Sequence, residues 1–330
     1  VALDLKSDAG REAALKLIET ADVVVHNFRP QAMERLGLDY EQVKAVNPSV
    51  VYCATYGYSK KGPYGDKGAL DDSIQAASGI AILQSMVEGE PRYLPTIIAD
   101  KTTGLMVVQS VLAALFHRER TGEGQSIEVP MFETMVDYAM IEHLYGATFD
   151  PPIAQMGYER IMNIERRPYQ TSDGGYLTVL PYTDKNWIDF FKLAGREEFL
   201  DDPVFQTYSN RLNNSKKVYA TLNEIVSTRT LNDWIAQLDA ANIPAMMVKT
   251  KEDLLDDEQL NATGFWHNVD HPTEGKLRFT DPPFRYSKTP STIRDMPPLL
   301  GEQSREILAE AGYSADEIDD LIAKNVTKAS

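Results

Sequence analysis

The chain has 330 residues, with 33 Lys and Arg against 49 Asp and Glu, so its formal net charge is −16. This charge disfavours nucleic acid as the main partner. The single cysteine, Cys53, excludes an intrachain disulfide framework and a multi-thiolate metal site. Every hydrophobic stretch is broken by charge or glycine before the ~18 residues that a membrane helix needs. We therefore expect a globular cytoplasmic protein with no membrane and no nucleic-acid partner.

The first 150 residues predict a parallel sheet covered by helices. The β-branched run at residues 23–25 is typical of a strand buried on both faces. Ser7 or Asp8 can cap the first helix, and the helix at residues 104–118 is apolar nearly all round, so we expect it to be buried. Strands are predicted at residues 1–5, 23–25, 50–55 and 126–129, and helices at residues 10–21, 30–36, 40–45, 104–118 and 133–144.

The pattern changes after residue 150. Residues 151–168 contain Pro151 and Pro152 and predict a linker. Residues 169–270 predict a smaller α/β domain. The proline-rich residues 271–330 predict an extended return segment that ends in C-terminal helices, the last of them capped by Ser314. The elements expected here are strands at 175–180 and 245–248 and helices at 184–193, 216–227, 231–241, 302–311 and 315–324.

Common catalytic motifs are absent. The five histidines have no metal-ligating spacing, and His117 is best explained as part of a solvated helix end. Cys53 lies in a β-branched run, where a buried, inert thiol is expected. Neither GxxxxGK[ST] nor GxGxxG occurs, so the sequence predicts no standard phosphate-binding loop.

One carboxylate, Asp100, stands directly before the predicted apolar helix, in LPTIIADKTTG. From position alone, a helix cap is the commoner role of such an aspartate. In either role the helix N-terminus favours the carboxylate form. A carboxylate held anionic in a dry pocket can attack an activated acyl group, so as a nucleophile Asp100 should be shielded from bulk water.

Two further segments contain candidate ligand-binding residues. Asn27, Phe28 and Arg29 lie between a strand and a helix, where open α/β sheets bind ligands. Arg29 and Arg35 suit a phosphate, although each alone is more simply a solvated charge. The glycine-rich segment YGYSKKGPYGDKGALDDSIQAASG supplies Lys60, Lys61 and Lys67, followed by Asp71 and Asp72.

In this order and spacing, the motifs resemble the class III coenzyme A transferases, the family of formyl-CoA:oxalate and carnitine CoA-transferases and α-methylacyl-CoA racemases. The resemblance runs from VALDLKSDAGR through NFRPQAMERLGL, ADKTTGL and TSDGGYLTV to PPLLGEQSREILAEAGYS. It implies a large Rossmann-like domain, a smaller α/β domain and an interlocked homodimer. It also implies a further strand, helix and strand before Val1, without which the sheet has an uncovered edge and weaker affinity for CoA.

The resemblance also implies a mechanism. Asp100 matches the family nucleophile, which forms an aspartyl-acyl anhydride and then an aspartyl-CoA thioester before CoA passes to a small carboxylic acid. Acyl-CoA is then a substrate, and no tightly bound cofactor or metal is needed. The CoA-binding residues implied are Asn27, Phe28, Arg29, Arg35, Lys67, Leu70, Asp71, Asp72 and Ala99.

Two alternatives remain at this stage. The racemase branch has a histidine directly before the aspartate matched to Asp71, and this chain has Leu70 there, which disfavours racemisation. A CoA-binding protein without turnover is the other. The family's oxyanion donors come from a glycine-rich loop, for which only Gly174 and Gly175 are found, so that assignment stays open.

Overall fold

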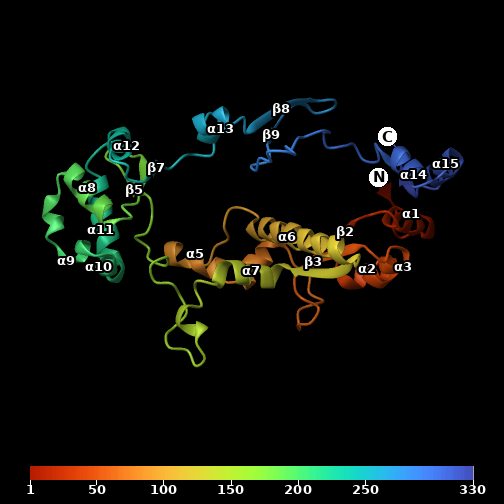
Figure 1. Ribbon diagram of the computed structural model, residues 1–330, viewed down its shortest axis with the longest axis horizontal. Coiled ribbons are helices and arrows are strands. Elements are labelled where there is room, and N and C mark those ends of the chain that lie inside the picture. Colours follow the sequence, from red (N-terminus) through yellow and green to blue (C-terminus); the bar gives the residue numbers. More distant parts are fainter. Residues whose placement is uncertain (330) are drawn as a thin grey trace. The chain divides into compact units, whose positions relative to one another are not determined.

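The computed structural model describes residues 1–329, with all their side chains except those of residues 87 and 88 (Figure 1). The chain forms two compact units. Unit 1 comprises Val1–Gly157 and Pro297–Ser330, and unit 2 comprises Tyr158–Met296. The first boundary between them falls inside the predicted linker at residues 151–168. Each unit has its own hydrophobic core, so each is described by itself.

Unit 1 is organised around a parallel sheet, which confirms the predicted α/β class. Its strands are β2 (Val23–His26), β3 (Val51–Tyr56) and β4 (Gln125–Pro130), in the order β2-β3-β4. Val23 pairs with Val51, and Val51 pairs with Gln125. The central strand is buried, and burial raises the pKa of the Cys53 thiol, so this cysteine is the inert core residue that its sequence context predicts.

The first strand differs from the prediction. Strand β1 (Ala2–Leu3) pairs antiparallel with β10 (Thr327–Lys328) rather than lying in the parallel sheet, so the two ends of the chain are side by side (Figure 1). Thr327 Oγ1 donates to the Ala2 carbonyl at 2.7 Å. A small core of residues from the N-terminal helix and the last two helices, including Ala13, Leu308 and Ile318, accounts for this arrangement.

The helices predicted in unit 1 are all present, whereas the helices at residues 71–77 and 80–88 were not predicted. Ser7 caps the first helix through the Gly10 N–H at 3.0 Å, and Ser314 caps the last through the Glu317 N–H at 3.3 Å. The helices of unit 1 are α1 (Asp8–Ile18), α2 (Pro30–Leu36), α3 (Tyr40–Val46), α4 (Asp71–Ala77), α5 (Ile80–Glu88), α6 (Ile98–Thr121), α7 (Met131–Met140), the 3₁₀ turn η1 (Tyr145–Thr148), α14 (Ser304–Glu310) and α15 (Ala315–Ala323).

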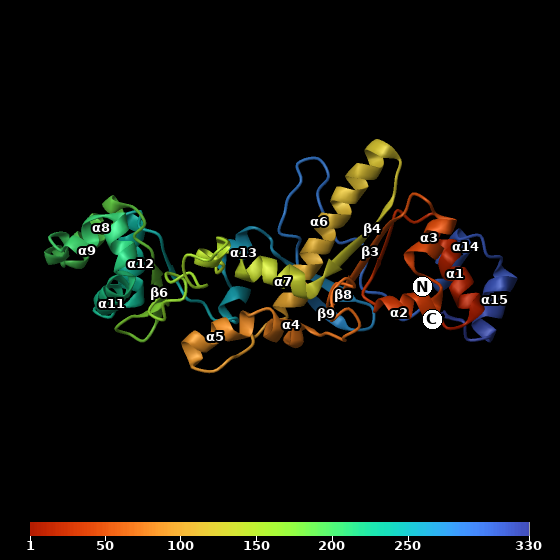
Figure 2. The same ribbon diagram turned by 90° about the horizontal axis from the view of Figure 1, so that it is seen from below.

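Helix α6 departs from the prediction in two ways. It begins at Ile98, six residues before the predicted start, so Asp100 lies within the helix. Within unit 1 it packs against β3, β4, α4 and α7 (Figure 2), and much of its apolar surface is exposed, with Leu105 72% and Phe116 64% accessible. The prediction of a fully buried helix is therefore wrong for the single chain. By length and composition, α6 also meets the criteria for a membrane-spanning helix, which core helices of soluble proteins meet as well.

Unit 2 contains an antiparallel sheet of β5 (Tyr169–Gln170), β6 (Tyr176–Val179) and β7 (Ala245–Met247). Its core includes the fully buried Phe190, Phe191 and Trp234. The helices are α8 (Asp184–Ala194), η2 (Glu197–Leu200), α9 (Pro203–Gln206), α10 (Tyr208–Asn213), α11 (Ser215–Val226), α12 (Leu231–Ala240), η3 (Asp253–Leu255) and α13 (Glu258–Ala262).

A β-hairpin in unit 2 was not expected from the sequence. Strands β8 (Trp266–His271) and β9 (Gly275–Thr280) pair antiparallel, with Trp266 opposite Thr280. The predicted domain boundary between residues 270 and 271 lies inside this hairpin. The prolines that follow it hid the hairpin, because they made the whole segment resemble an extended connection.

Candidate functional site

Asp100 is the third residue of α6, and its carboxylate is free. Ile97 occupies the N-cap position, so Asp100 is not the helix cap. Within the described chain, no hydrogen bond or ion pair to the Asp100 carboxylate is found. Asp100 is an exposed residue. The expectation of a shielded carboxylate is therefore wrong for the single chain.

The N-terminus of α6 is capped by a residue from another helix, Asp71. Its Oδ2 accepts hydrogen bonds from the backbone N–H groups of Ala99 at 2.8 Å and Asp100 at 3.0 Å. Its Oδ1 accepts from Gln75 Nε2 at 2.6 Å, and the Asp71 residue is only 7% accessible. A buried carboxylate with three donors holds the first turn of α6, and with it the backbone of Asp100, in a fixed position.

The same arrangement changes the acidity of Asp100. Partial burial and, second, the negative charge of Asp71 raise the pKa of the Asp100 carboxyl. The ionised form of such a carboxyl is more basic than that of an ordinary surface aspartate. The consequence is a free, basic carboxylate on a backbone that Asp71 holds in place through the N–H groups of Ala99 and Asp100.

The glycine-rich loop at residues 57–70 connects β3 to α4, and its two ends touch. A Cβ atom on Gly57 would lie 2.3 Å from Ala69 Cβ, so only glycine permits this approach. At the far end, Ser73 Oγ accepts from the Leu70 N–H at 2.9 Å and donates to the Leu70 carbonyl at 2.7 Å. Leu70 itself is 79% accessible. The loop therefore ends with an exposed leucine at the N-terminus of α4.

Of the predicted phosphate-binding residues, Asn27, Phe28 and Arg29 directly follow the carboxyl end of β2, and Arg35 lies on the helix after them. Asn27, Phe28 and Arg29 are exposed between β2 and α2, and Arg35 is exposed in the last turn of α2. Within residues 1–329, no carboxylate pairs with either guanidinium. Open α/β sheets bind ligands at this edge, so unpaired arginines here suit an anionic ligand.

The loop after β3 contributes further cations to this edge. Gln31 donates a hydrogen bond to Asp66, which joins α2 to the loop. Lys60 Nζ lies 3.7 Å from Glu34, and Lys67 Nζ lies 3.8 Å from the centre of the Tyr64 ring. The contact between α2 and the loop links the arginine region to the segment that ends at Leu70. Asp72 is exposed on α4, and in the described chain its side chain forms no hydrogen bond or ion pair with the other candidate residues.

A cavity of about 270 Å³ opens at the ends of β2, β3 and β4. Its lining includes His26, whose Nδ1 is buried without a hydrogen-bond partner in the described chain. Burial, and to a smaller extent the charge of Lys60, lower the pKa of this imidazole, so it is neutral at pH 7.

Glu128 on β4 closes the other side of this cavity. It accepts hydrogen bonds from Tyr56 Oη at 2.5 Å, the Lys60 N–H at 2.9 Å and Ser59 Oγ at 3.0 Å. Burial opposes its ionisation, but these hydrogen bonds and the Lys60 charge together lower its pKa. Neither Glu128 nor His26 was predicted as a site residue, although both stand near the ends of predicted strands, where such residues meet.

Two other sequence candidates lie elsewhere. Gly174 and Gly175 form the turn between β5 and β6 in unit 2, where the Gly174 N–H donates to the Thr171 carbonyl at 3.0 Å. This turn uses the Gly174 N–H as an internal donor. Among residues 1–329, no group of three or more His, Cys, Asp or Glu side chains is arranged to hold a metal ion.

Comparison with known proteins identifies the family. The family model described as CoA-transferase family III matches residues 1–304. An acyl-CoA transferase of Fusarium pseudograminearum is 29% identical over 96% of this chain and 70% of its own length. A formyl-CoA:oxalate CoA-transferase of Streptomyces coelicolor is also 29% identical, over 96% of this chain and 81% of its own.

A solved structure agrees with these relatives. A CAIB/BAIF family protein from Brucella suis is 30% identical, with a TM-score of 0.76 over 94% of this chain and 81% of that chain. The chain therefore belongs to CoA-transferase family III and is an enzyme of that family.

Proposed function

We propose that this enzyme transfers CoA from an acyl-CoA thioester to a small carboxylic acid, with Asp100 as the nucleophile. The observation that carries the proposal is that two neighbouring aspartates have different roles. Asp71 caps α6 through the N–H groups of Ala99 and Asp100, which leaves the Asp100 carboxylate free on a fixed backbone. A carboxylate that is needed as a cap could not also attack a thioester.

The reaction proceeds through covalent intermediates on Asp100. One carboxylate oxygen attacks the thioester carbonyl, and CoA thiolate leaves, which gives an aspartyl-acyl anhydride. The thiolate attacks the aspartyl carbonyl carbon and expels the donor carboxylate, which gives an aspartyl-CoA thioester. The acceptor carboxylate attacks that carbon and releases thiolate. The thiolate then attacks the acceptor's carbonyl, so the new acyl-CoA leaves and Asp100 is regenerated.

This sequence of steps conserves the activation of the acyl group. Each intermediate is an anhydride or a thioester, and the steps need no net proton or electron transfer. The chemistry therefore requires neither a resident metal nor a redox cofactor.

The exposed arginines supply the binding energy for CoA in this proposal. Arg29 and Arg35 are unpaired within the described chain and match the phosphates of CoA in charge and geometry. Asn27, Phe28 and Lys67 complete the polar surface around them. The loop at residues 57–70 leads from this surface toward Asp100, so the pantetheine would follow it past Leu70 and Asp72.

Racemisation is disfavoured by the side chain at position 70. Leu70 stands at the N-cap of α4, directly before Asp71, and has no group that can carry a proton. Transfer needs no proton at the α-carbon of the acyl group, whereas racemisation does. The absence of a proton-carrying side chain at position 70 therefore supports transfer over racemisation.

We further propose that a second copy of the chain covers the exposed apolar face of α6 and shields Asp100. Leu105, Val108, Leu112 and Phe116 are exposed along this helix, and Ile97 is exposed next to Asp100. Apolar surface of this extent is unusual on a protein that functions as a monomer. The interlocked homodimer implied by the family resemblance would bury it.

The test is to trap the intermediate and to remove the nucleophile. With acyl-CoA and no acceptor acid, intact-protein mass spectrometry should show a CoA-sized adduct on the enzyme, mapped by peptide analysis to Asp100. Asp100→Asn should lose transfer by at least about 10³-fold, as expected when a nucleophile is removed. Asp137→Asn, at an exposed aspartate on α7 that has no part in the proposed site, is the matched control and should keep activity.

The same experiment separates the alternatives. Undiminished transfer by Asp100→Asn rejects the mechanism. Thermal stabilisation by CoA with no product from any acid tested would identify a CoA-binding protein without turnover. Deuterium incorporation at the α-carbon without an acceptor acid would identify a racemase.

A further inference from the structure

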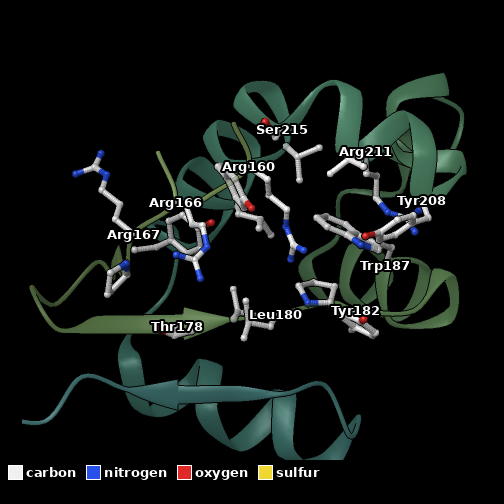
Figure 3. A pocket seen from close by; sticks show the side chains of 18 residues that line it. Arg160, Arg166, Arg167, Thr178, Leu180, Tyr182, Trp187, Tyr208, Arg211 and Ser215 are labelled. Carbon is white, nitrogen blue, oxygen red and sulfur yellow. The ribbon is translucent and has the colours of Figure 1, made fainter. Parts of the chain in front are cut away.

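Unit 2 contains a cavity that the proposed transfer mechanism does not use (Figure 3). Its volume is about 430 Å³, within the roughly 300–1,000 Å³ range of small-molecule sites. It lies among residues 160–168, the end of β6, α8, α10 and α11, so all of its walls belong to one unit. The shape of the cavity is therefore set by unit 2 alone.

The floor of this cavity is apolar and aromatic. Val179, Trp187, Val218 and Leu222 are buried and line it. Trp187 also packs against Phe191 and Phe205 of the core, which fixes its indole ring. Rigid aromatic walls of this kind recognise flat, apolar ligand groups.

Arginines stand over this apolar floor. The Arg160 guanidinium points into the cavity and Arg166 approaches from the same side, whereas Arg167 points away (Figure 3). Hydrogen bonds to the hydroxyl groups of Tyr219 and Tyr158 raise the pKa of Arg160, which keeps it positively charged. Arg211 is buried and donates hydrogen bonds to Asp184 and to the Phe205 carbonyl, so its guanidinium stabilises the fold and is not available to a ligand.

The charges at the cavity are not balanced by the protein. Within the described chain, Arg160 and Arg166 form no ion pair with a carboxylate, although acidic residues outnumber basic ones by 49 to 33. Arg167, by contrast, lies 3.7 Å from Glu165. Two unneutralised guanidinium groups at the mouth of an apolar cavity favour a ligand that supplies the missing negative charge.

We propose that this cavity binds an aromatic carboxylate, with its ring against Trp187 and its carboxylate held by Arg160 and Arg166. The planar guanidinium fork matches a carboxylate, and the apolar floor excludes small hydrated anions such as acetate. The lining of the cavity belongs to unit 2 and Asp100 belongs to unit 1, and the proposed binding does not depend on the covalent mechanism.

The experiment is isothermal titration calorimetry of the full chain with 2-naphthoate, in the absence of acyl-CoA. Saturable binding is expected, with no binding of acetate and none of the neutral 2-naphthalenemethanol. Arg160→Gln should weaken naphthoate binding by about 10- to 100-fold, as expected for a lost charge-assisted hydrogen bond. Arg167→Gln is the matched control and should stay within about twofold of the parent chain.

Two further variants keep the test decisive. Leu180 is exposed at the cavity mouth, so Leu180→Trp should fold normally and block binding by filling the space. Asp100→Asn should bind naphthoate as the parent chain does, whatever its transfer activity.

Four results would overturn the proposal. These are no binding of naphthoate, equal binding of the neutral alcohol, equal loss in the Arg160 and Arg167 variants, and tighter binding of 2-naphthyl phosphate than of naphthoate.

Discussion

Replacing Asp71 by alanine tests the cap on which the candidate site is built. The substitution removes the acceptor for the N–H groups of Ala99 and Asp100. The Ala99 N–H is buried, and an unsatisfied buried donor costs about 1–3 kcal/mol, whereas water can reach the exposed Asp100. Gln75 loses one bond but keeps the Thr96 carbonyl at 3.3 Å. The substitution also removes the interaction of the Asp71 charge with the helix dipole. Together, these losses should lower the free energy of unfolding by about 2–3 kcal/mol.

Urea unfolding measures this effect. A loss of that size should lower the midpoint for unit 1 by about 1 M, since the urea dependence is about 1–3 kcal/mol per M. The three tryptophans, Trp187, Trp234 and Trp266, all lie in unit 2. Tryptophan fluorescence therefore reports unit 2, and far-UV circular dichroism followed in parallel reports both units.

The matched control is Asp72→Ala, one residue further along the same helix. Asp72 is exposed and its side chain caps nothing in the described structure, so Asp72→Ala loses only the interaction of a first-turn charge with the helix dipole. The free energy of unfolding should therefore change by less than about 1 kcal/mol. Equal effects of the two substitutions, or no effect of Asp71→Ala, would refute the cap and with it the fixed position of Asp100.

Three more predictions follow from the same geometry. Asp100 must be ionised to attack, so transfer should fall as the pH drops through its raised pKa. Asp71→Asn removes a neighbouring negative charge that raises this pKa, so it should shift the acid limb of the kcat profile to lower pH. Arg29→Gln and Arg35→Gln should each raise the KM for acyl-CoA about tenfold with little change in kcat, and added salt should reduce the difference from the parent enzyme. Leu112→Asp, in the exposed face of α6, should convert a dimer to monomer in light scattering and lower transfer, and an unchanged mass would contradict the proposed interface.

The candidate site shows which residues a sequence can nominate and which it cannot. Asp100, Asp71 and the arginines were all nominated from motifs and from their places between strands and helices. Glu128 and His26 were not, because each becomes notable only through its surroundings. Glu128 receives bonds from residues 68 to 72 positions away, which no local pattern reveals.

The sequence alone determined the elements whose stabilisation is local. Helices α1 and α15 begin next to serine caps, and α8, α11 and α12 lie within a few residues of their predicted ranges, because caps and apolar periodicity act over one or two turns. The parallel strands β2 and β3 were likewise visible from their apolar runs, and a strand was predicted at residues 126–129 of β4.

Only the tertiary structure decided the contacts between distant residues. Pairing of β1 with β10 joins positions 325 residues apart, and the Asp71 cap reaches α6 from 28 residues away. A helix N-terminus needs acceptors for its N–H groups, but nothing in the local sequence says which part of the chain supplies them. That choice is made when the helices pack, and here it decides that Asp71 holds the helix and Asp100 stays free.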